Sequence, residues 1–428
     1  MKVYLQPKRT EWDAILQRPT LETANLDATV GRIIEEIGQD GDAAVRRYTA
    51  QFDHVELDRL HVSEAEIAAA GESLSEELKA AIRRAKTNIE AFHRRQALTE
   101  EVVETMPGVT CWRKSVAIDK VGLYIPGGTA PLFSTVLMLG IPAVLAGCRE
   151  IVLCSPPDRE GKLHPAILYT AHLIGITKIF RVGGVQAIGA MALGTESIPQ
   201  VYKIFGPGNQ YVTAAKQWVS RQGTAIDMPA GPSEVLVCAD DTADPEFVAA
   251  DLLSQAEHGV DSQVVLVAFA KKQVEAVQEA LEHQLSDLPR ADIARKALEN
   301  SVAIVVTDRK EALDLINEYA PEHLILSIID ADDFATGIIN AGSVFMGNYT
   351  PESVGDYASG TNHTLPTNGF ARAYSGVSLD SFVKKITFQR LTEDGLRSLG
   401  PAVEVMAEAE ELRAHKLAVT RRLDRLNN

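Results

Sequence analysis

Val121-Gly122-Leu123-Tyr124-Ile125 is an apolar run that ends directly at Pro126-Gly127-Gly128. Similar short runs rich in branched residues follow it, and stretches with the three-to-four spacing of helices separate them. Strands that end near Gly or Pro and lead into helices indicate a parallel, doubly wound sheet, because parallel strands need long crossovers. The sequence therefore predicts an α/β fold. The strands of this first sheet are expected at residues 121–125, 150–154, 178–182 and 202–205.

A second series of the same kind follows, which suggests two α/β units in tandem, although no sequence repeat is visible. The first hundred residues and the last fifty instead show helical periodicity, and the final helix is long, charged and suited to docking on a neighbour. Strands of the second series are expected at 234–239, 263–269, 302–307 and 323–328, with helices at 245–257, 271–285 and 309–319. The remaining helices are expected at 26–49, 64–70, 75–95 and 401–426.

The composition describes a large acidic globular protein. The chain has 428 residues, 46% of them apolar, so two or more well-packed domains are expected. A diffuse formal charge of −16 argues against binding to nucleic acid or a membrane surface, since proteins bind both through basic patches. The N-terminus shows no targeting segment, and no run reaches the ~18 apolar residues of a membrane span, so a cytoplasmic protein is expected. The cysteines lack metal-ligand spacing and are expected to be reduced core thiols: Cys111, Cys148, Cys154 and Cys238.

The strand ends of the first α/β unit form a candidate cofactor site. Glycines at such ends let a phosphate approach backbone N–H groups at a helix start. None of the three segments is a GxGxxG fingerprint, and glycines that only make tight turns are an equally good interpretation. These segments are therefore compatible with a bound dinucleotide but do not by themselves indicate one. The segments are 124–128, 182–187 and 205–209.

Four short polar segments in the C-terminal half contain a histidine close to a carboxylate or an amide. They are residues 254–259, 320–323, 355–363 and 410–415. This is the inventory that a first-row metal and a general acid and base require. Gln255 and His258 fall on one face at the end of a helix and can present an amide oxygen and an imidazole to one ion. A solvated surface histidine is the alternative.

Glu322 and His323 begin a buried-looking strand, where both side chains can reach a bound ligand and supply two proton-transfer groups. An exposed strand start is the alternative. The loop with Asp356 and His363 is either functional or an ordinary long turn. His415 lies in an amphipathic helix, for which a solvated charged face is the default interpretation.

Six segments, all in order, closely resemble the histidinol dehydrogenase family. The similarity runs from about residue 25 to the C-terminus without a departure at the positions that matter, whereas the first twenty residues carry no family feature. Several long blocks in one order make this far more specific than a lone motif. The segments are VGLYIPGG (121–128), FGPGN (205–209), DMPAGPSE (227–234), QAEH (255–258), PEH (321–323) and GDYASGTNH (355–363).

The resemblance implies a zinc enzyme that oxidises L-histidinol to L-histidine through L-histidinaldehyde with two NAD in succession, in the last steps of histidine biosynthesis. It implies two Rossmann-like doubly wound α/β units with helical N-terminal and C-terminal segments. His323 would accept the hydroxyl proton and Glu322 would activate water. One zinc per subunit would be bound by Gln255, His258, Asp356 and His415. These four and Ser233, His323, Glu352, His363 and Glu410 would surround the substrate, and Tyr124, Gln186 and Asn209 would contact NAD.

The terminal helix with Glu410 and His415 carries an apolar stripe too isolated to form its own core, so it must pack on another surface. The resemblance implies that this surface is the neighbouring subunit of a homodimer with shared active sites. Four parts are predicted: an N-terminal segment (1–22), a larger α/β domain with the metal and substrate site (23–120 with 233–377), an NAD-binding domain (121–232) and a helical dimerisation segment (378–428).

Three other functions compete with this interpretation. A zinc hydrolase would leave the first α/β unit without a purpose, and a metabolite-binding protein would need neither Glu322 nor His323. The nearer alternative is a related zinc and NAD-dependent dehydrogenase of another amino or sulfo alcohol. Glu352, His363 and Glu410 argue against it, since the resemblance assigns them to histidinol.

Overall fold

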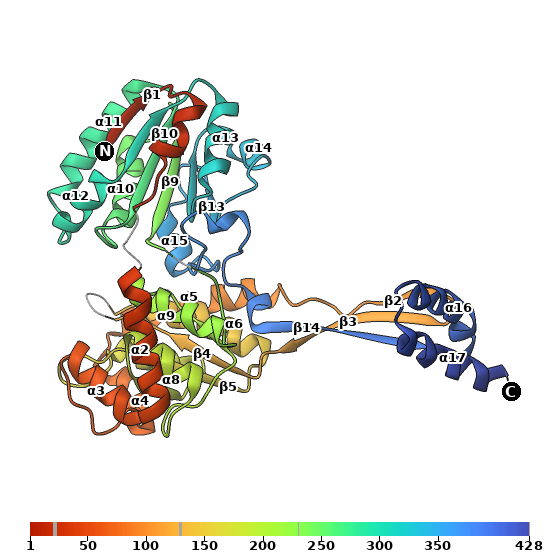
Figure 1. Ribbon diagram of the computed structural model, residues 1–428. Coiled ribbons are helices and arrows are strands. Elements are labelled where there is room, and N and C mark those ends of the chain that lie inside the picture. The colour runs from red at the N-terminus through yellow and green to blue at the C-terminus, as the bar shows by residue number, and fades with distance from the viewer. Residues whose placement is uncertain (20–23, 128–130, 230, 428) are drawn as a thin grey trace. The chain divides into compact units, whose positions relative to one another are not determined.

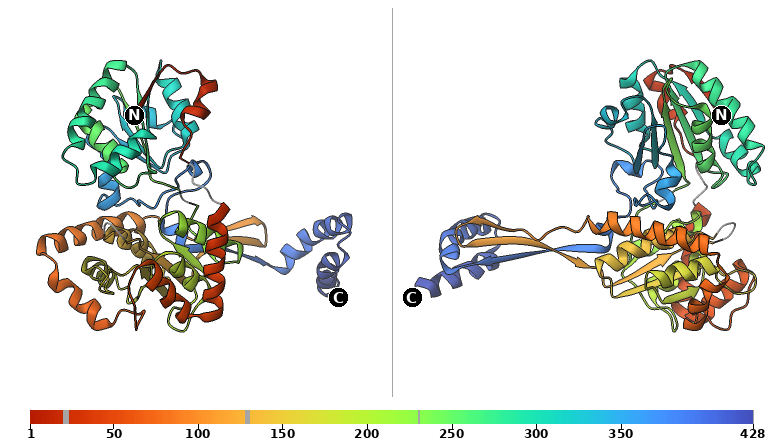
Figure 2. Two further views of the ribbon diagram at one scale, coloured as in Figure 1. Left: turned by 60° about the vertical axis from the view of Figure 1, so that its left-hand side comes forward. Right: turned by 180° about the vertical axis from the view of Figure 1, so that it is seen from behind.

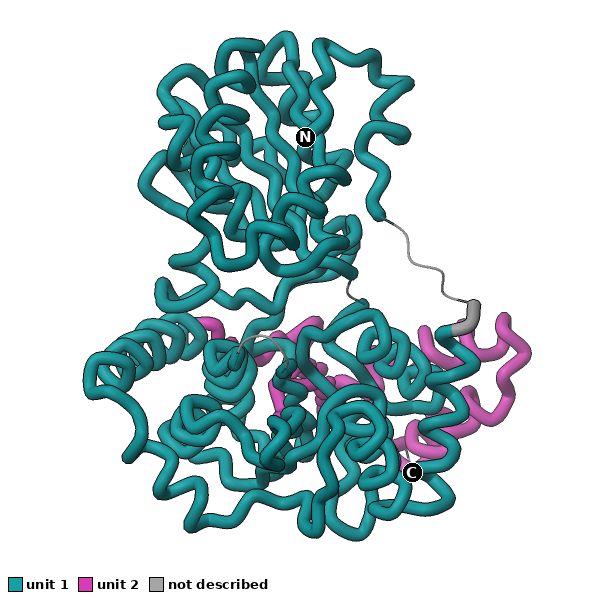
Figure 3. The backbone as a smooth tube through the Cα atoms, turned by 90° about the vertical axis from the view of Figure 1, so that its left-hand side faces the viewer, with its two compact units in different colours: residues 1–95, 118–382 teal, residues 96–117, 383–428 magenta. Residues whose placement is uncertain are grey.

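The computed structural model describes residues 1–19, 24–127, 131–229 and 231–427, so Gly128 and Ala230 of the similar segments lie outside the described residues. The chain divides into two compact units, residues 1–95 with 118–382 and residues 96–117 with 383–428 (Figure 3). The first unit contains two parallel sheets and the second an antiparallel one. Among the described residues no helix is long and apolar enough to cross a membrane.

The first sheet has helices on both faces, because its strands are apolar on both sides. Val121 and Leu123 belong to the core on one face, while Tyr124 and Val152 belong to the core on the other. The strand order is β6-β5-β4-β7-β8, all parallel. The strands are β4 (Lys120–Tyr124), β5 (Glu150–Ser155), β6 (Lys178–Arg181), β7 (Lys203–Phe205) and β8 (Ala225–Ile226). One face is covered by α2 (Ala24–Asp40), α3 (Asp42–Phe52), α8 (Gly184–Leu193) and α9 (Gln210–Arg221), and the other by α4 (Glu64–Ala69), α5 (Glu76–Arg94), α6 (Phe133–Ala146) and α7 (Pro165–Leu173).

The second sheet, of which β1, β9, β10 and β13 are labelled in Figure 1, is built in the same way from strands in the order β1-β11-β10-β9-β12-β13. Val235 and Ile325 face one core, and Leu236 and Leu324 face the other. The strands are β1 (Lys2–Leu5), β9 (Glu234–Ala239), β10 (Gln263–Ala268), β11 (Val302–Val305), β12 (His323–Ser327) and β13 (Ser343–Met346). Helices α10 (Pro245–Ala256), α11 (Lys271–Leu285) and α12 (Ala291–Glu299) cover one face, and α1 (Trp12–Ile15), α13 (Arg309–Tyr319) and α14 (Ala331–Ala335) the other. Helix α15 (Glu352–Tyr357) follows β13, and the 3-10 helices are η1 (Arg9–Glu11), η2 (Ala70–Ser73), η3 (Phe370–Arg372) and η4 (Leu379–Phe382).

The predicted α/β class with parallel sheets is confirmed, and each predicted strand has a counterpart. The packing nevertheless differs from the predicted grouping of residues 23–120 with 233–377. Helices α2 to α5 pack on the first sheet, and β1 joins the second sheet as an edge strand. Helical periodicity marks an apolar face but not the sheet that will cover it.

The second unit is an antiparallel sheet with a pair of helices. It consists of β2 (Val102–Met106), β3 (Val109–Ala117), β14 (Val383–Leu391), α16 (Glu393–Ala409) and α17 (Arg413–Asn427). Helix α16 begins next to the β2–β3 turn, where the Thr392 N–H donates to the Gly108 carbonyl. Figure 2 shows α16 and α17 side by side, and Leu423 of α17 lies against Gly400 of α16.

The prediction of one continuous terminal helix at 401–426 is wrong. The chain turns between α16 and α17, where Glu411 adopts a left-handed φ of 59°. Glu410 therefore caps the end of one helix and His415 lies in the next. The turn contains no Gly or Pro, so the sequence carries no breaker signal at this point.

Candidate active site

The predicted catalytic pair lies at the amino-terminal edge of the second sheet. His323 is the first residue of β12 and pairs in register with Val235, so Glu322 lies beside Glu234, the first residue of β9. Open parallel sheets usually bind ligands at the carboxyl ends of their strands. The chemistry here lies at the opposite edge, where α10 ends and brings Gln255 with it.

The His323 ring is buried and has hydrogen-bond partners on both nitrogens. Its Nδ1 lies 3.1 Å from Gln255 Nε2, 3.2 Å from the Glu234 carbonyl oxygen and 3.6 Å from Glu322 Oε2. Its Nε2 lies 3.3 Å from Asp356 Oδ1. Burial opposes a charge on the ring, yet the Glu322 and Asp356 carboxylates raise the pKa of His323 well above its usual value. The ring is therefore a strong base in this environment.

Two further carboxyl groups of the site differ in charge state. Burial raises the pKa of Glu352 to about 8, and the Ser254 hydroxyl donates to its Oε1 over 2.6 Å. Burial would also raise the pKa of Asp356, but the His323 ring and the nearby His363 and His258 lower it. Glu352 can therefore be neutral while Asp356 stays ionised.

His363 connects the site to α6 of the first sheet. Its Nδ1 lies 2.8 Å from the Asp356 carbonyl oxygen, and its Nε2 lies 3.1 Å from the Thr135 hydroxyl. Burial lowers its pKa. Ser233 directly precedes β9, and His258 is exposed just beyond the end of α10.

Three of the four predicted metal ligands belong to this region of the first unit. Gln255 Oε1 is buried and has no hydrogen-bond partner among the described residues, which leaves an amide oxygen available to a cation. His258 lies close enough to affect the pKa of Asp356. No group of three or more His, Cys, Asp and Glu side chains in the described ranges could hold a metal by itself. In the first unit the predicted set supplies only two side chains of these kinds, His258 and Asp356, beside the Gln255 amide, so this result is compatible with it. An N and O donor set suits zinc.

The fourth predicted ligand, His415, and the substrate residue Glu410 belong to the second unit. Both side chains are exposed. Glu410 caps the end of α16 and His415 lies in α17, so the prediction that both lie on one helix is wrong.

A cavity of about 890 Å³ lies at the carboxyl ends of the first sheet. Its lining includes all three predicted NAD contacts, Tyr124, Gln186 and Asn209, and it does not include Glu322 or His323. The Tyr124 hydroxyl accepts from the Gly184 N–H over 3.2 Å, and burial raises its pKa to about 12, so it stays protonated. Gln186 donates to Asp53 over 3.2 Å, while its buried Oε1 has no partner in the described chain and can accept from a ligand.

The loop before Asn209 is held by a buried ion pair that the sequence analysis did not identify. Lys216 Nζ lies 2.5 Å from Asp227 and donates to the Gly206 carbonyl over 2.8 Å, while Asp227 accepts from the Gly206 N–H. Gly206 has a φ of 137°, and a Cβ at this position would lie 2.1 Å from the Tyr124 carbonyl oxygen. Asn209 caps α9 by accepting from the N–H groups of Tyr211 and Val212. The backbone conformation and the close approach of Tyr124 therefore explain the glycine at position 206 without a cofactor.

Comparison with known proteins identifies the family. A family model described as histidinol dehydrogenase matches residues 16–423. The chain belongs to the histidinol dehydrogenase family. It is 63% identical to histidinol dehydrogenase of Bacteroides fragilis over 427 residues, 100% of both chains, and 54% identical to that of Aliivibrio fischeri, over 97% of this chain and 95% of the relative. The crystal structure of histidinol dehydrogenase from Elizabethkingia anophelis matches with a TM-score of 0.98 at 56% identity, covering 100% of this chain and 99% of that one.

The predicted resemblance is therefore confirmed, and the activity is that of an NAD-dependent oxidoreductase acting on histidinol at the end of histidine biosynthesis. The family match begins at residue 16, earlier than predicted, and so includes part of the N-terminal segment. Two of the four cysteines are core thiols, as predicted, whereas Cys111 and Cys148 are only partly buried. Cys154 and Cys238 are fully buried, and burial raises the pKa of each.

Four polar side chains near the site were not assigned a role from the sequence: Arg18, Thr135, Glu234 and Ser254. Each contacts the site through a partner distant in sequence. Ser254 and Glu234 directly adjoin predicted site residues, and this adjacency is the signal that could have identified them. Arg18 and Thr135 lie outside all of the similar segments.

Proposed function

We propose that this enzyme carries out both oxidations, from L-histidinol to L-histidinaldehyde and on to L-histidine, at one site with Glu322 and His323 as its proton acceptors. The observation that carries the proposal is the buried pair itself. Glu322 Oε2 lies 3.6 Å from His323 Nδ1, and the other ring nitrogen faces Asp356. Two adjacent bases with separate partners suit a reaction that removes two protons at different steps.

In the first step, His323 accepts the proton of the substrate hydroxyl while a hydride leaves its carbon for NAD. His323 can accept this proton only in its neutral form, and Asp356 favours the charged form as long as it faces the ring. If Asp356 were a zinc ligand, its carboxylate would stabilise the charged ring less, and the neutral ring that accepts the hydroxyl proton would be more readily available.

In the second step, Glu322 takes a proton from water, whose oxygen adds to the aldehyde carbon. A second hydride then leaves that carbon for a second NAD, and the acid forms. One water and two NAD are consumed for each histidinol, and two NADH are released. Neutral Glu352 can donate a hydrogen bond, and His363 can orient the substrate beside Asp356.

Gln255, His258 and Asp356 from the first unit, with His415 from the second, would hold one zinc ion per subunit. When bound, zinc supplies a positive centre that orients the ring nitrogen and amine of histidinol. Ser233, Glu352 and Glu410 would complete the substrate contacts. NAD would occupy the cavity at the first sheet, since Tyr124, Gln186 and Asn209 all line it. The same proposal includes the Rossmann-like character of the two α/β units and a cytoplasmic location.

The two oxidations are tested by product stoichiometry. With limiting L-histidinol and excess NAD, we expect two NADH per histidinol and histidine as the product. The measurement follows the absorbance of the reduced nicotinamide together with amino-acid analysis. A ratio of one with accumulation of the aldehyde would contradict the proposal, and it would favour a simpler alcohol dehydrogenase.

The homodimer is supported by apolar side chains that remain exposed on the helices of the second unit. Val405 and Met406 are 70% and 65% exposed, and Leu412 and Leu417 are 44% and 41% exposed. Although α16 and α17 pack on each other, these side chains need a further partner. We propose that a second copy covers them and that Glu410 and His415 act in the site of that copy.

Sites shared between subunits predict complementation between two inactive variants. After subunit exchange of equal amounts of His415→Ala and Glu322→Gln, about a quarter of the sites in a random mixture would draw both intact residues from different chains. Full oxidation of histidinol to histidine should recover to a corresponding extent. A mixture of His415→Ala with wild-type protein bearing a different tag controls for exchange. Demonstrated heterodimers without recovery would mean that each chain completes its own site.

A further inference from the structure

Arg18 in the N-terminal segment forms a bidentate ion pair with Glu234. Its Nε donates to Glu234 Oε1 over 2.6 Å, and its Nη2 donates to Oε2 over 2.9 Å. The side chains are only 15% and 3% exposed, so this pair is largely shielded from water. Bidentate arginine–carboxylate pairs fix orientation as well as charge.

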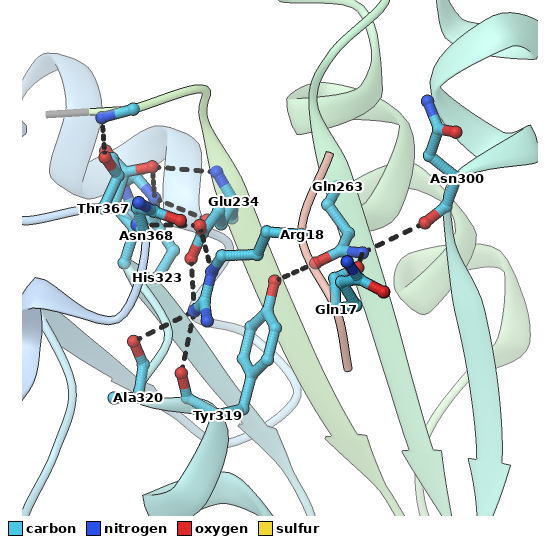
Figure 4. Close-up of polar contacts among 12 residues, drawn as sticks. Gln17, Arg18, Glu234, Gln263, Asn300, Tyr319, Ala320, His323, Thr367 and Asn368 are labelled. Atoms are coloured by element: carbon cyan, nitrogen blue, oxygen red, sulfur yellow. Dashed lines mark hydrogen bonds and ion pairs between the residues drawn. The ribbon is translucent and has the colours of Figure 1, made fainter. Parts of the chain in front are cut away.

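The guanidinium of Arg18 is itself held in place by α13. Its Nη2 also donates to the Tyr319 carbonyl over 2.7 Å, and the guanidinium carbon lies 4.1 Å from the centre of the Tyr319 ring. The Tyr319 hydroxyl donates to Gln263 over 2.9 Å, which fixes the ring in turn. Figure 4 shows Arg18 between Glu234 and the end of α13. The arginine is therefore a rigid support rather than a mobile surface charge.

Glu234 contacts both proposed catalytic residues, Glu322 and His323, through its backbone groups. Its N–H donates to Glu322 Oε2 over 2.9 Å, and its carbonyl oxygen lies 3.2 Å from His323 Nδ1. The Asn368 N–H donates to the Glu234 carboxylate over 2.8 Å, on the side chain that Arg18 also binds. Fixing the side chain of Glu234 therefore fixes the backbone groups that orient the pair.

We propose that Arg18 is a positioning residue for the oxidation of the aldehyde, acting through Glu234 on Glu322. This inference rests on the proposed roles of Glu322 and His323. His323 has additional contacts with Gln255 and Asp356, so a shift of Glu234 should displace Glu322 more than His323. Arg18 also neutralises the Glu234 carboxylate, which would otherwise repel that of Glu322.

The test uses two variants of the full-length enzyme. Arg18→Lys keeps the charge but lacks the planar fork, and Arg18→Gln with Glu234→Gln removes both charges together. The double variant is needed because removing one partner of a buried ion pair can unfold the protein. In both, we expect the turnover of supplied L-histidinaldehyde to fall between about 10-fold and 10²-fold, the cost of a misplacement near 1 Å. Turnover of histidinol to the aldehyde and the KM for histidinol should change less than about threefold.

Arg9→Lys is the matched control, since Arg9 lies in the same segment but forms an exposed ion pair with Glu318 at 3.3 Å. It should leave both half-reactions unchanged. A folded Arg18→Lys enzyme or double variant with wild-type aldehyde oxidation, or with equal losses in both half-reactions, would overturn the inference. A Glu322→Gln reference separates this result from the proposed function. If that reference lost both half-reactions equally, the role of Glu322 would fail, whereas unchanged turnover in Arg18→Lys would still count against Arg18 alone.

Discussion

Replacing Glu322 by glutamine should slow the oxidation of L-histidinaldehyde by ~10² or more, the range of general base catalysis. The change keeps the shape of the side chain and an oxygen that can accept from the Glu234 N–H, but it removes the group that takes a proton from water. A 10²-fold loss corresponds to about 2.7 kcal/mol of transition-state stabilisation. Oxidation of histidinol to the aldehyde should fall much less, because His323 remains.

The two half-reactions are measured separately, with histidinol and with histidinaldehyde as the supplied substrate. Glu318→Gln is a suitable control, because Glu318 lies on the adjoining helix α13 and forms an exposed ion pair with Arg9. It should leave both rates unchanged. Equal losses in the two half-reactions of Glu322→Gln would show that Glu322 is not specific to the aldehyde step.

Removing zinc with a chelator should abolish turnover and leave most of the secondary structure intact. The hydrophobic cores on the two faces of each sheet contain none of the four proposed ligands, Gln255, His258, Asp356 and His415. We therefore expect the fold not to depend on the proposed zinc ion, in contrast to small zinc domains that unfold without their metal. We expect an unchanged far-UV circular dichroism spectrum and full recovery of activity on adding zinc.

Two results would contradict this expectation. Collapse of the circular dichroism signal at room temperature would show that the metal builds the fold. Full turnover in protein shown by metal analysis to lack zinc would remove zinc from the proposed site. A Gln255→Ala variant provides a matched test, since it removes one oxygen ligand from the end of α10 without removing a core residue.

The sequence predicted the strands well because their signals are local. The run at residues 235–239 is apolar throughout and ends at a polar turn, and the structure buries each of its residues on one face or the other. The antiparallel strands β2 and β3 were missed, although Pro107-Gly108 between two branched runs is a turn signal that could have revealed the hairpin. Pairing of β3 with β14 brings together residues 266 to 282 positions apart, and no local pattern marks it.

In the candidate site, too, some residues could be identified from the sequence and others only from the structure. Residue type and family resemblance identified Gln255, Glu322, His323 and Asp356, and the structure places them in contact around one imidazole ring. The similarity could not reveal what supports them, because Arg18 belongs to none of the similar segments and meets Glu234 across 216 positions of sequence.

By itself the sequence determined the α/β class, the order of most strands and helices, and the chemistry available at the site, because apolar periodicity and side-chain type are properties of short segments. Only the tertiary structure decided which sheet each helix covers, that the terminal helix breaks at Glu411, and that Glu322 and His323 lie at the amino-terminal edge of their sheet with Arg18 behind them. These features depend on contacts between distant segments, whose free energy is gained only when the whole core assembles.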